Sequence, residues 1–247
     1  MPSFNSFTGN NDNNNVNYDY SAPVSETNLL TKVFGVMFLS LLVTAGVSYG
    51  LGYLFSYFFN SGNDAGLDVL FGLMGISSIG LLVMAFIMPM VMARGKHSLL
   101  PSYIIYLAFM SILLSTIYVE FEMSMIIFAF GATSVVFGIM ALMGYLSKGS
   151  LRGTSMLVGG LFFGVIILSL INIFRQSDQI SWIVSFAMFA IILFITMLDV
   201  RRIKDIANSG MKNSYNLVLY GSFMLYLDFI NIFLRLLMYI ARFADKK

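Results

Sequence analysis

The chain has 247 residues, of which 58% are hydrophobic and only 11% are charged, whereas soluble domains carry about 25% charged residues. This composition excludes an ordinary water-soluble globular domain. The absence of cysteine excludes disulfides and zinc–thiolate sites, a single histidine is too few for a metal cluster, and a net charge of +2 gives no support for nucleic-acid binding.

After a polar N-terminal segment, long apolar stretches follow one another to near the end of the chain. Six of them contain no charged residue, and each is long enough for a helix that crosses about 30 Å of hydrocarbon, which takes roughly 20 residues. A seventh is interrupted by Asp228 and Arg235. We predict an all-α membrane protein. It has a disordered polar tail at 1–27 and one seven-helix transmembrane domain at 28–247. The seven helices are expected at about 29–59, 67–92, 101–119, 123–146, 153–174, 180–199 with a continuation to about 207, and 215–240.

Lysine and arginine residues are distributed unevenly between the two ends of these helices. Seven crossings place nine basic residues on the side of the N-terminus and four on the opposite side. Because cytoplasmic loops carry an excess of Lys and Arg, we expect a cytoplasmic N-terminus. Seven full crossings place the C-terminus on the opposite side of the membrane, whereas a re-entrant last segment would return it to the cytoplasm. We also expect Arg201, Arg202 and Lys204, on the continuation of the sixth helix, to extend to the cytoplasmic surface.

The last helix carries polar residues on one stripe, because their successive spacings are seven, three and four: Gly221, Asp228, Asn231 and Arg235. An acid near the bilayer centre costs about 2.5 to 3.5 kcal/mol on insertion scales and is a functional candidate by default. Such a group needs a proton, a cation or a paired base. Arg235 and Asp199 are the two candidate partners of Asp228.

Other charged residues allow simpler interpretations. Asp199 ends the sixth apolar stretch, and Arg202 lies one turn further on, where it would form an ion pair with Asp199. Glu120 and Glu122 lie in a short loop, where they would either attract cations to an entrance or simply be solvated. The single tryptophan, Trp182, is typical of an anchor at the membrane interface.

Several segments resemble one known family. Leu225–Leu234 (LYLDFINIFL) resembles the last-helix signature of the Bax inhibitor-1 family, including its bacterial YccA-like branch. Three further sets are similar to that family's fourth, fifth and sixth helices: Phe130–Thr133 with Phe137–Gly138 and Gly144–Tyr145; Leu170–Phe174; and Asp199 with Ile203 and Lys204.

The resemblance implies seven helices with the last one central, in the inner membrane of a bacterium, and no enzymatic activity or resident cofactor. For bacterial members it implies a pH-sensitive calcium leak in which Asp199 and Asp228 share a proton. Two close carboxylates do not both ionise cheaply, so the pair would act as a latch. When ionised it would offer oxygen ligands to calcium, but only transiently, because tight sites use six to eight oxygens.

Two other functions remain open at this point. The chain would instead be a regulatory binding partner of a membrane-bound protease or another membrane protein, with the 1–27 tail as its handle and no ion conduction. It would otherwise be a proton-coupled carrier of a small solute, for which a buried acid is equally suitable.

Overall fold

The computed structural model describes residues 26–94, 98–148, 151–208 and 215–244, so the predicted tail lies outside the described residues except at its last two positions. Those two positions are helical. Every regular element in the described ranges is an α-helix: α1 Glu26–Asn60, α2 Asp64–Arg94, α3 Leu100–Leu114, α4 Ile117–Glu120, α5 Met123–Leu146, α6 Leu151–Arg175, α7 Asp178–Asn208 and α8 Tyr215–Ala244.

Seven spans among the described residues are long and apolar enough to cross a membrane, which confirms the predicted fold class. The third span is divided into α3 and the one-turn helix α4, whereas the other spans are single helices. Two hydroxyl groups lie at the division, where Ser115 Oγ donates to the Ile112 carbonyl at 2.6 Å and Thr116 Oγ1 donates to the Leu113 carbonyl at 2.8 Å. Such bonds compete with the regular helical ladder.

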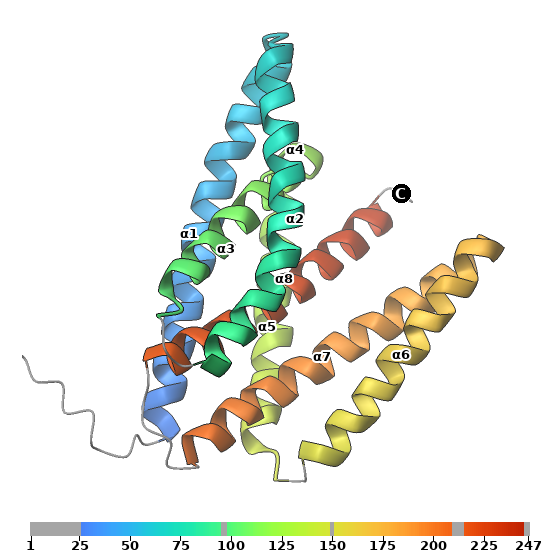
Figure 1. Ribbon diagram of the computed structural model, residues 1–247. Helices are drawn as coiled ribbons and strands as arrows, with labels where there is room; N and C mark the ends of the chain where they lie inside the picture. The colour runs from blue at the N-terminus through green and yellow to red at the C-terminus, as the bar shows by residue number, and fades with distance from the viewer. Residues whose placement is uncertain (1–25, 95–97, 149–150, 209–214, 245–247) are drawn as a thin grey trace, which may run out of the picture.

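Helix α8 is the most buried span. In an apolar stretch of 18 residues of this helix, 72% of the residues are buried inside the protein, against 11 to 33% in the corresponding stretches of the other spans. It packs against α1, α2, α3, α5 and α7, whereas α6 packs mainly on α7. Figure 1 shows α8 crossing between the long α1–α2 pair and the α6–α7 pair. The buried polar groups of α8, which include Ser222 and Asp228, are therefore held among protein side chains.

Buried hydroxyl groups tie α8 to α1. The Thr44 and Tyr226 hydroxyls are 3.0 Å apart, and Ser222 Oγ donates to the Val33 carbonyl at 2.9 Å. Helices surrounded by lipid tails associate without a hydrophobic driving force. Close packing and interhelical hydrogen bonds therefore contribute much of the association free energy. These two bonds fix the depth of α8 relative to α1.

Close contact between α5 and α7 depends on Gly144. A Cβ atom at this position would overlap the carbonyl oxygen of Met197 and lie 3.1 Å from Val200 Cβ. Small residues let helix backbones approach this closely in membranes. The contact holds the 197–200 segment of α7, which includes Asp199, against α5.

Candidate functional site

Asp199 and Asp228 lie on neighbouring helices in the interior of the protein. Helix α7 continues to Asn208, nine residues beyond Asp199, so Asp199 lies within the helix and not at its end. Nine residues correspond to about 13 Å along the axis. Both acids are buried, with 7% of Asp199 and 6% of Asp228 exposed. The continuation of α7 thus brings Asp199 to the level of the membrane-embedded acid on α8.

Three residues of α7 surround the carboxyl group of Asp228. They are Asp199, Arg202 and Thr196, whose side chains lie close enough to Asp228 to affect its charge. Thr196 is fully buried, and its Oγ1 donates to the Ile192 carbonyl at 3.0 Å. Asp228 Oδ2 is buried and has no hydrogen-bond partner among the residues described. The site therefore leaves one carboxylate oxygen without a donor.

Arg202 forms an ion pair with Asp199. Its Nη1 donates to Asp199 Oδ1 at 3.2 Å, and half of its side chain is exposed. Both residues line a cavity of about 340 Å³ between α6 and α7, together with Ser155 and Gly159. Asp199 thus connects this cavity to the buried Asp228.

The charges in this cluster do not balance when both acids are ionised. Two carboxylates and one guanidinium carry a net charge of −1, and one bound proton makes the cluster neutral. Helices α3 and α5 contain no charged residue, and the nearest other guanidiniums are directed elsewhere: Arg201 bonds to Ser147 and lies 3.8 Å from Asp205, and Arg235 bonds to Ser185. A buried net charge is costly, so the free energy of this cluster depends on whether both acids are ionised.

Arg235 lies away from Asp228. Its Nη1 donates to Ser185 Oγ at 3.3 Å, and it forms no ion pair with Asp228 in the described part of the chain. The other members of the predicted stripe also differ in surroundings: Asn231 is exposed, and Gly221 packs against Val33 and Ile203. The four residues share one face of α8 but do not form one polar cluster.

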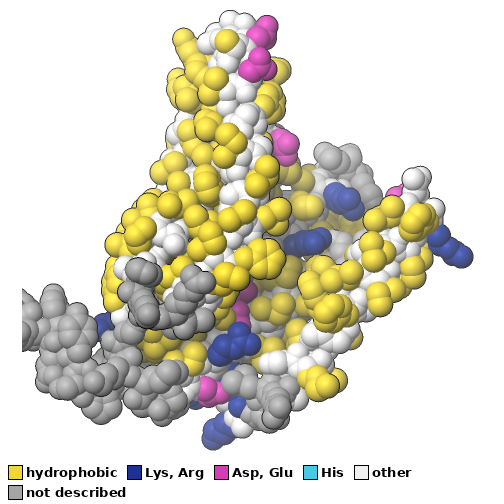
Figure 2. All heavy atoms as spheres, in the orientation of Figure 1, with side chains coloured by type: hydrophobic (Ala, Val, Ile, Leu, Met, Phe, Trp, Pro, Cys, Tyr) yellow, Lys and Arg dark blue, Asp and Glu magenta, His cyan; other side chains and the backbone are white. Residues whose placement is uncertain are grey.

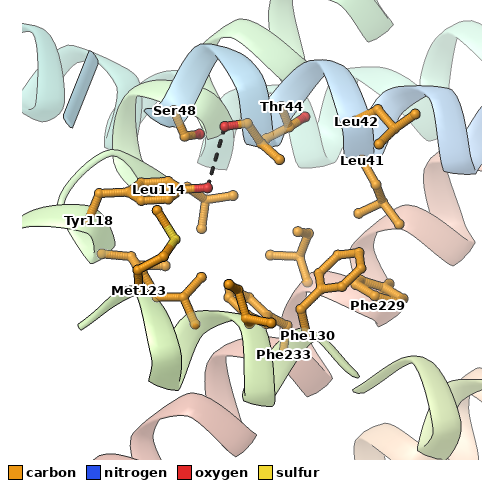
Figure 3. Close-up of a pocket in the computed structure, with 15 residues that line it drawn as sticks. Leu41, Leu42, Thr44, Ser48, Leu114, Tyr118, Met123, Phe130, Phe229 and Phe233 are labelled. Carbon is orange, nitrogen blue, oxygen red and sulfur yellow. Dashed lines mark hydrogen bonds between the residues drawn. The ribbon is translucent and has the colours of Figure 1, made fainter. Parts of the chain in front are cut away.

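A second cavity lies between α1, α4, α5 and α8 (Figure 3). It has a volume of about 310 Å³ and a largely apolar lining, to which Phe229 and Ile230 contribute directly after Asp228. Its few polar groups include the Tyr118 hydroxyl, which donates to the Ala45 carbonyl at 3.4 Å. An apolar lining of this kind offers few ligands to a hydrated ion.

The prediction that Arg201 extends to the surface is wrong. Only 8% of Arg201 is exposed, and its Nη1 donates to Ser147 Oγ at 2.9 Å, which ties α7 to the residue that follows α5. Lys204 Nζ donates to the Tyr145 carbonyl at 2.8 Å. The basic run on α7 thus divides into a structural pair, Arg201 and Lys204, and Arg202, which faces the acids.

Neither acid of the predicted entrance loop takes part in this cluster. Glu120 ends α4 and Glu122 precedes α5, and both are exposed.

Sequence analysis also missed Thr196, although it lies one turn before Asp199 on the same side of α7. No group of three or more His, Asp or Glu residues that could hold a metal occurs within the described ranges. Asp199 and Asp228 alone fall short of a tight calcium site.

Comparison with known proteins gives matches over almost the whole chain. Residues 26–245 match the family described as "Inhibitor of apoptosis-promoting Bax1". The chain is 29% identical over 219 residues to the inner membrane protein YbhL of Escherichia coli strain K12, which covers 84% of this chain and 88% of YbhL. It is 28% identical over 224 residues to an uncharacterized protein of Borreliella burgdorferi, with 86% of this chain and 91% of that protein covered. An uncharacterized membrane protein of Streptococcus pyogenes serotype M1 is 26% identical over 166 residues, which are 65% of this chain and 71% of that protein. Residues 26–245, which match the family, include all eight helices.

Proposed function

The chain belongs to the Bax inhibitor-1 family and is a multi-pass membrane protein, and from this premise we propose that it is a pH-controlled calcium leak of the inner membrane, gated by Asp199 and Asp228. The observation that carries the proposal is the buried cluster of two carboxylates and one guanidinium on α7 and α8.

A shared proton keeps the cluster neutral and the two helices together. When that proton leaves, the cluster gains a net charge of −1 in a poorly hydrated interior, which favours either a bound cation or the entry of water. Divalent calcium is attracted from the cavity between α6 and α7, to whose lining Asp199 contributes. Flux is therefore expected to rise as the pH rises.

Conduction also requires a change on the other side of α8. The cavity that includes Phe229 and Ile230 is apolar, and calcium passes only if this region hydrates or its side chains move apart. Repulsion between the ionised Asp199 on α7 and Asp228 on α8 would push these two helices apart and so favour hydration of this region. Two carboxylates hold calcium weakly enough for it to leave, as conduction requires.

Calcium flux into liposomes tests the proposal. Wild-type protein, Asp199→Asn and Asp228→Asn are compared between about pH 6 and 8, with Asp178→Asn as the matched control because Asp178 is exposed at the start of α7. We expect the pH dependence to persist in Asp178→Asn and to disappear in the two site variants. Identical pH profiles in all four proteins would refute the gate.

A further inference from the structure

A second polar site lies between α6, α7 and α8, at the end of the bundle where α7 begins. Its cavity has a volume of about 320 Å³, and polar side chains from all three helices line it: Ser169, Asn172, Ser181, Ser185, Arg235, Tyr239 and Arg242. Figure 2 shows basic side chains in the hollow between α8 and the α6–α7 pair. This cavity does not include Asp199 or Asp228.

The cavity contains two guanidinium groups and no acid. Arg235 gives one hydrogen bond to Ser185, whose Oγ is 3.0 Å from the Tyr239 hydroxyl, and Arg242 lies 5.4 Å from the centre of the Trp182 ring. Neither arginine forms an ion pair among the residues the structure covers. Because a guanidinium has five N–H donors in a planar fork, the pair has spare donors suited to a phosphate oxygen.

The two charged residues at the neighbouring helix ends, one acid and one base, do not compensate the positive charge of the two arginines. Asp178 begins α7 and is exposed, and no ion pair within the described residues joins it to either arginine. Arg175 ends α6, is also exposed, and does not line the cavity. The local charge of the cavity is therefore positive.

Aromatic residues mark the depth of this cavity in the membrane. Trp182 stacks on Phe186 and on Tyr239, with ring centroids 5.5 and 6.4 Å apart. Tryptophan and tyrosine gather at the level of the lipid headgroups, and apolar residues such as Phe174 are exposed on the neighbouring face of α6. Arginines without an acidic partner at this depth are stabilised by the phosphate groups of the lipids themselves.

We propose that this cavity binds an anionic phospholipid from the adjacent leaflet, with its phosphate held by Arg235 and Arg242 and its acyl chains against α6 and α8. The headgroup of phosphatidylglycerol has a net negative charge, which compensates part of the positive charge of the two guanidiniums. The choline group of a zwitterionic lipid brings a further cation, which the same two arginines repel. The proposal is independent of the calcium leak.

Trp182 is the only tryptophan of the chain and contacts Arg242, so its fluorescence reports on this site. The full chain is reconstituted in bilayers that contain dibrominated phosphatidylglycerol or dibrominated phosphatidylcholine, and quenching of Trp182 gives the relative binding of the two lipids. We expect a preference for phosphatidylglycerol of about fivefold for each arginine. Equal quenching by the two lipids in the wild type would overturn the proposal.

Variants separate charge from packing. Arg235→Gln with Arg242→Gln should remove the preference, whereas Arg235→Lys with Arg242→Lys should retain most of it, because the charges remain. Arg175→Gln is the matched control at the same end of the bundle and should keep the full preference. If the glutamine pair keeps the preference, or Arg175→Gln loses it, the cavity is not the lipid site.

Free phosphate provides the remaining arm of the test. Inorganic phosphate is added to the wild-type protein in bilayers with dibrominated phosphatidylglycerol. No recovery of Trp182 fluorescence is expected, since the acyl chains add to the binding of the lipid. Recovery at millimolar phosphate would show a site for a soluble anion and would overturn the assignment to lipid.

Discussion

Gly144→Ala is expected to destabilise the protein through the contact between α5 and α7. The added Cβ would overlap the Met197 carbonyl oxygen and lie 3.2 Å from the Met197 carbonyl carbon, and no side-chain rotation moves these backbone atoms. The two helices must separate, and overpacking of this kind costs about 1 to 3 kcal/mol. For a chain of this size the melting temperature should fall by roughly 2 to 12 °C.

Trp182 fluorescence during heating in detergent measures this effect, and Gly138→Ala is the matched control. Gly138 lies on the same helix, and a Cβ there meets no atom within 4 Å. Its substitution should leave the melting temperature unchanged or raise it slightly, because alanine favours the helix. Equal melting temperatures for Gly144→Ala and Gly138→Ala would show that close approach at Gly144 does not hold α5 and α7 together.

Three further predictions concern the charge cluster, the core and the tail. Arg202→Gln removes the positive charge that favours the ionised acids, so the midpoint of calcium flux should move to higher pH by about one unit, measured in liposomes; an unchanged midpoint would remove Arg202 from the cluster. Thr44→Val and Tyr226→Phe each break the same hydrogen bond. The loss of unfolding free energy in the double variant should therefore be smaller than the sum of the two single losses by roughly 1 kcal/mol. Thermal unfolding measures the three variants, and additive losses would contradict the contact. Deletion of residues 1–25 should leave calcium flux intact, and lost flux would contradict a gate built only from α7 and α8.

Much of the fold could be predicted from the sequence because the membrane imposes one simple requirement. Each charge-free stretch has to form a helix, since backbone groups in hydrocarbon need internal partners. The division between α3 and α4 was missed, because it depends on the hydroxyls of Ser115 and Thr116, and such hydroxyls are also common within continuous helices.

The candidate site could be predicted only in part. Asp228 was identifiable because an acid in an apolar stretch is costly. Its surroundings were not, because spacing along α8 places Arg235 on the same face at two turns' distance, yet the long arginine side chain bonds to Ser185 on α7. The burial of Arg201 likewise depends on how closely α5 approaches α7, which Gly144 permits and no local pattern of charges indicates.

The proposal that Asp199 and Asp228 share a proton is tested most directly by infrared difference spectroscopy of the reconstituted protein between about pH 6 and 8. The C=O stretch of a protonated carboxylic acid in an apolar environment reports the proton itself, without any assumption about flux. One such band is predicted to be present at the acidic end, to decrease in a single step as the pH rises, and to be absent in Asp228→Asn. A spectrum without this band in the wild type, or the same band in both Asp199→Asn and Asp228→Asn, would contradict the account.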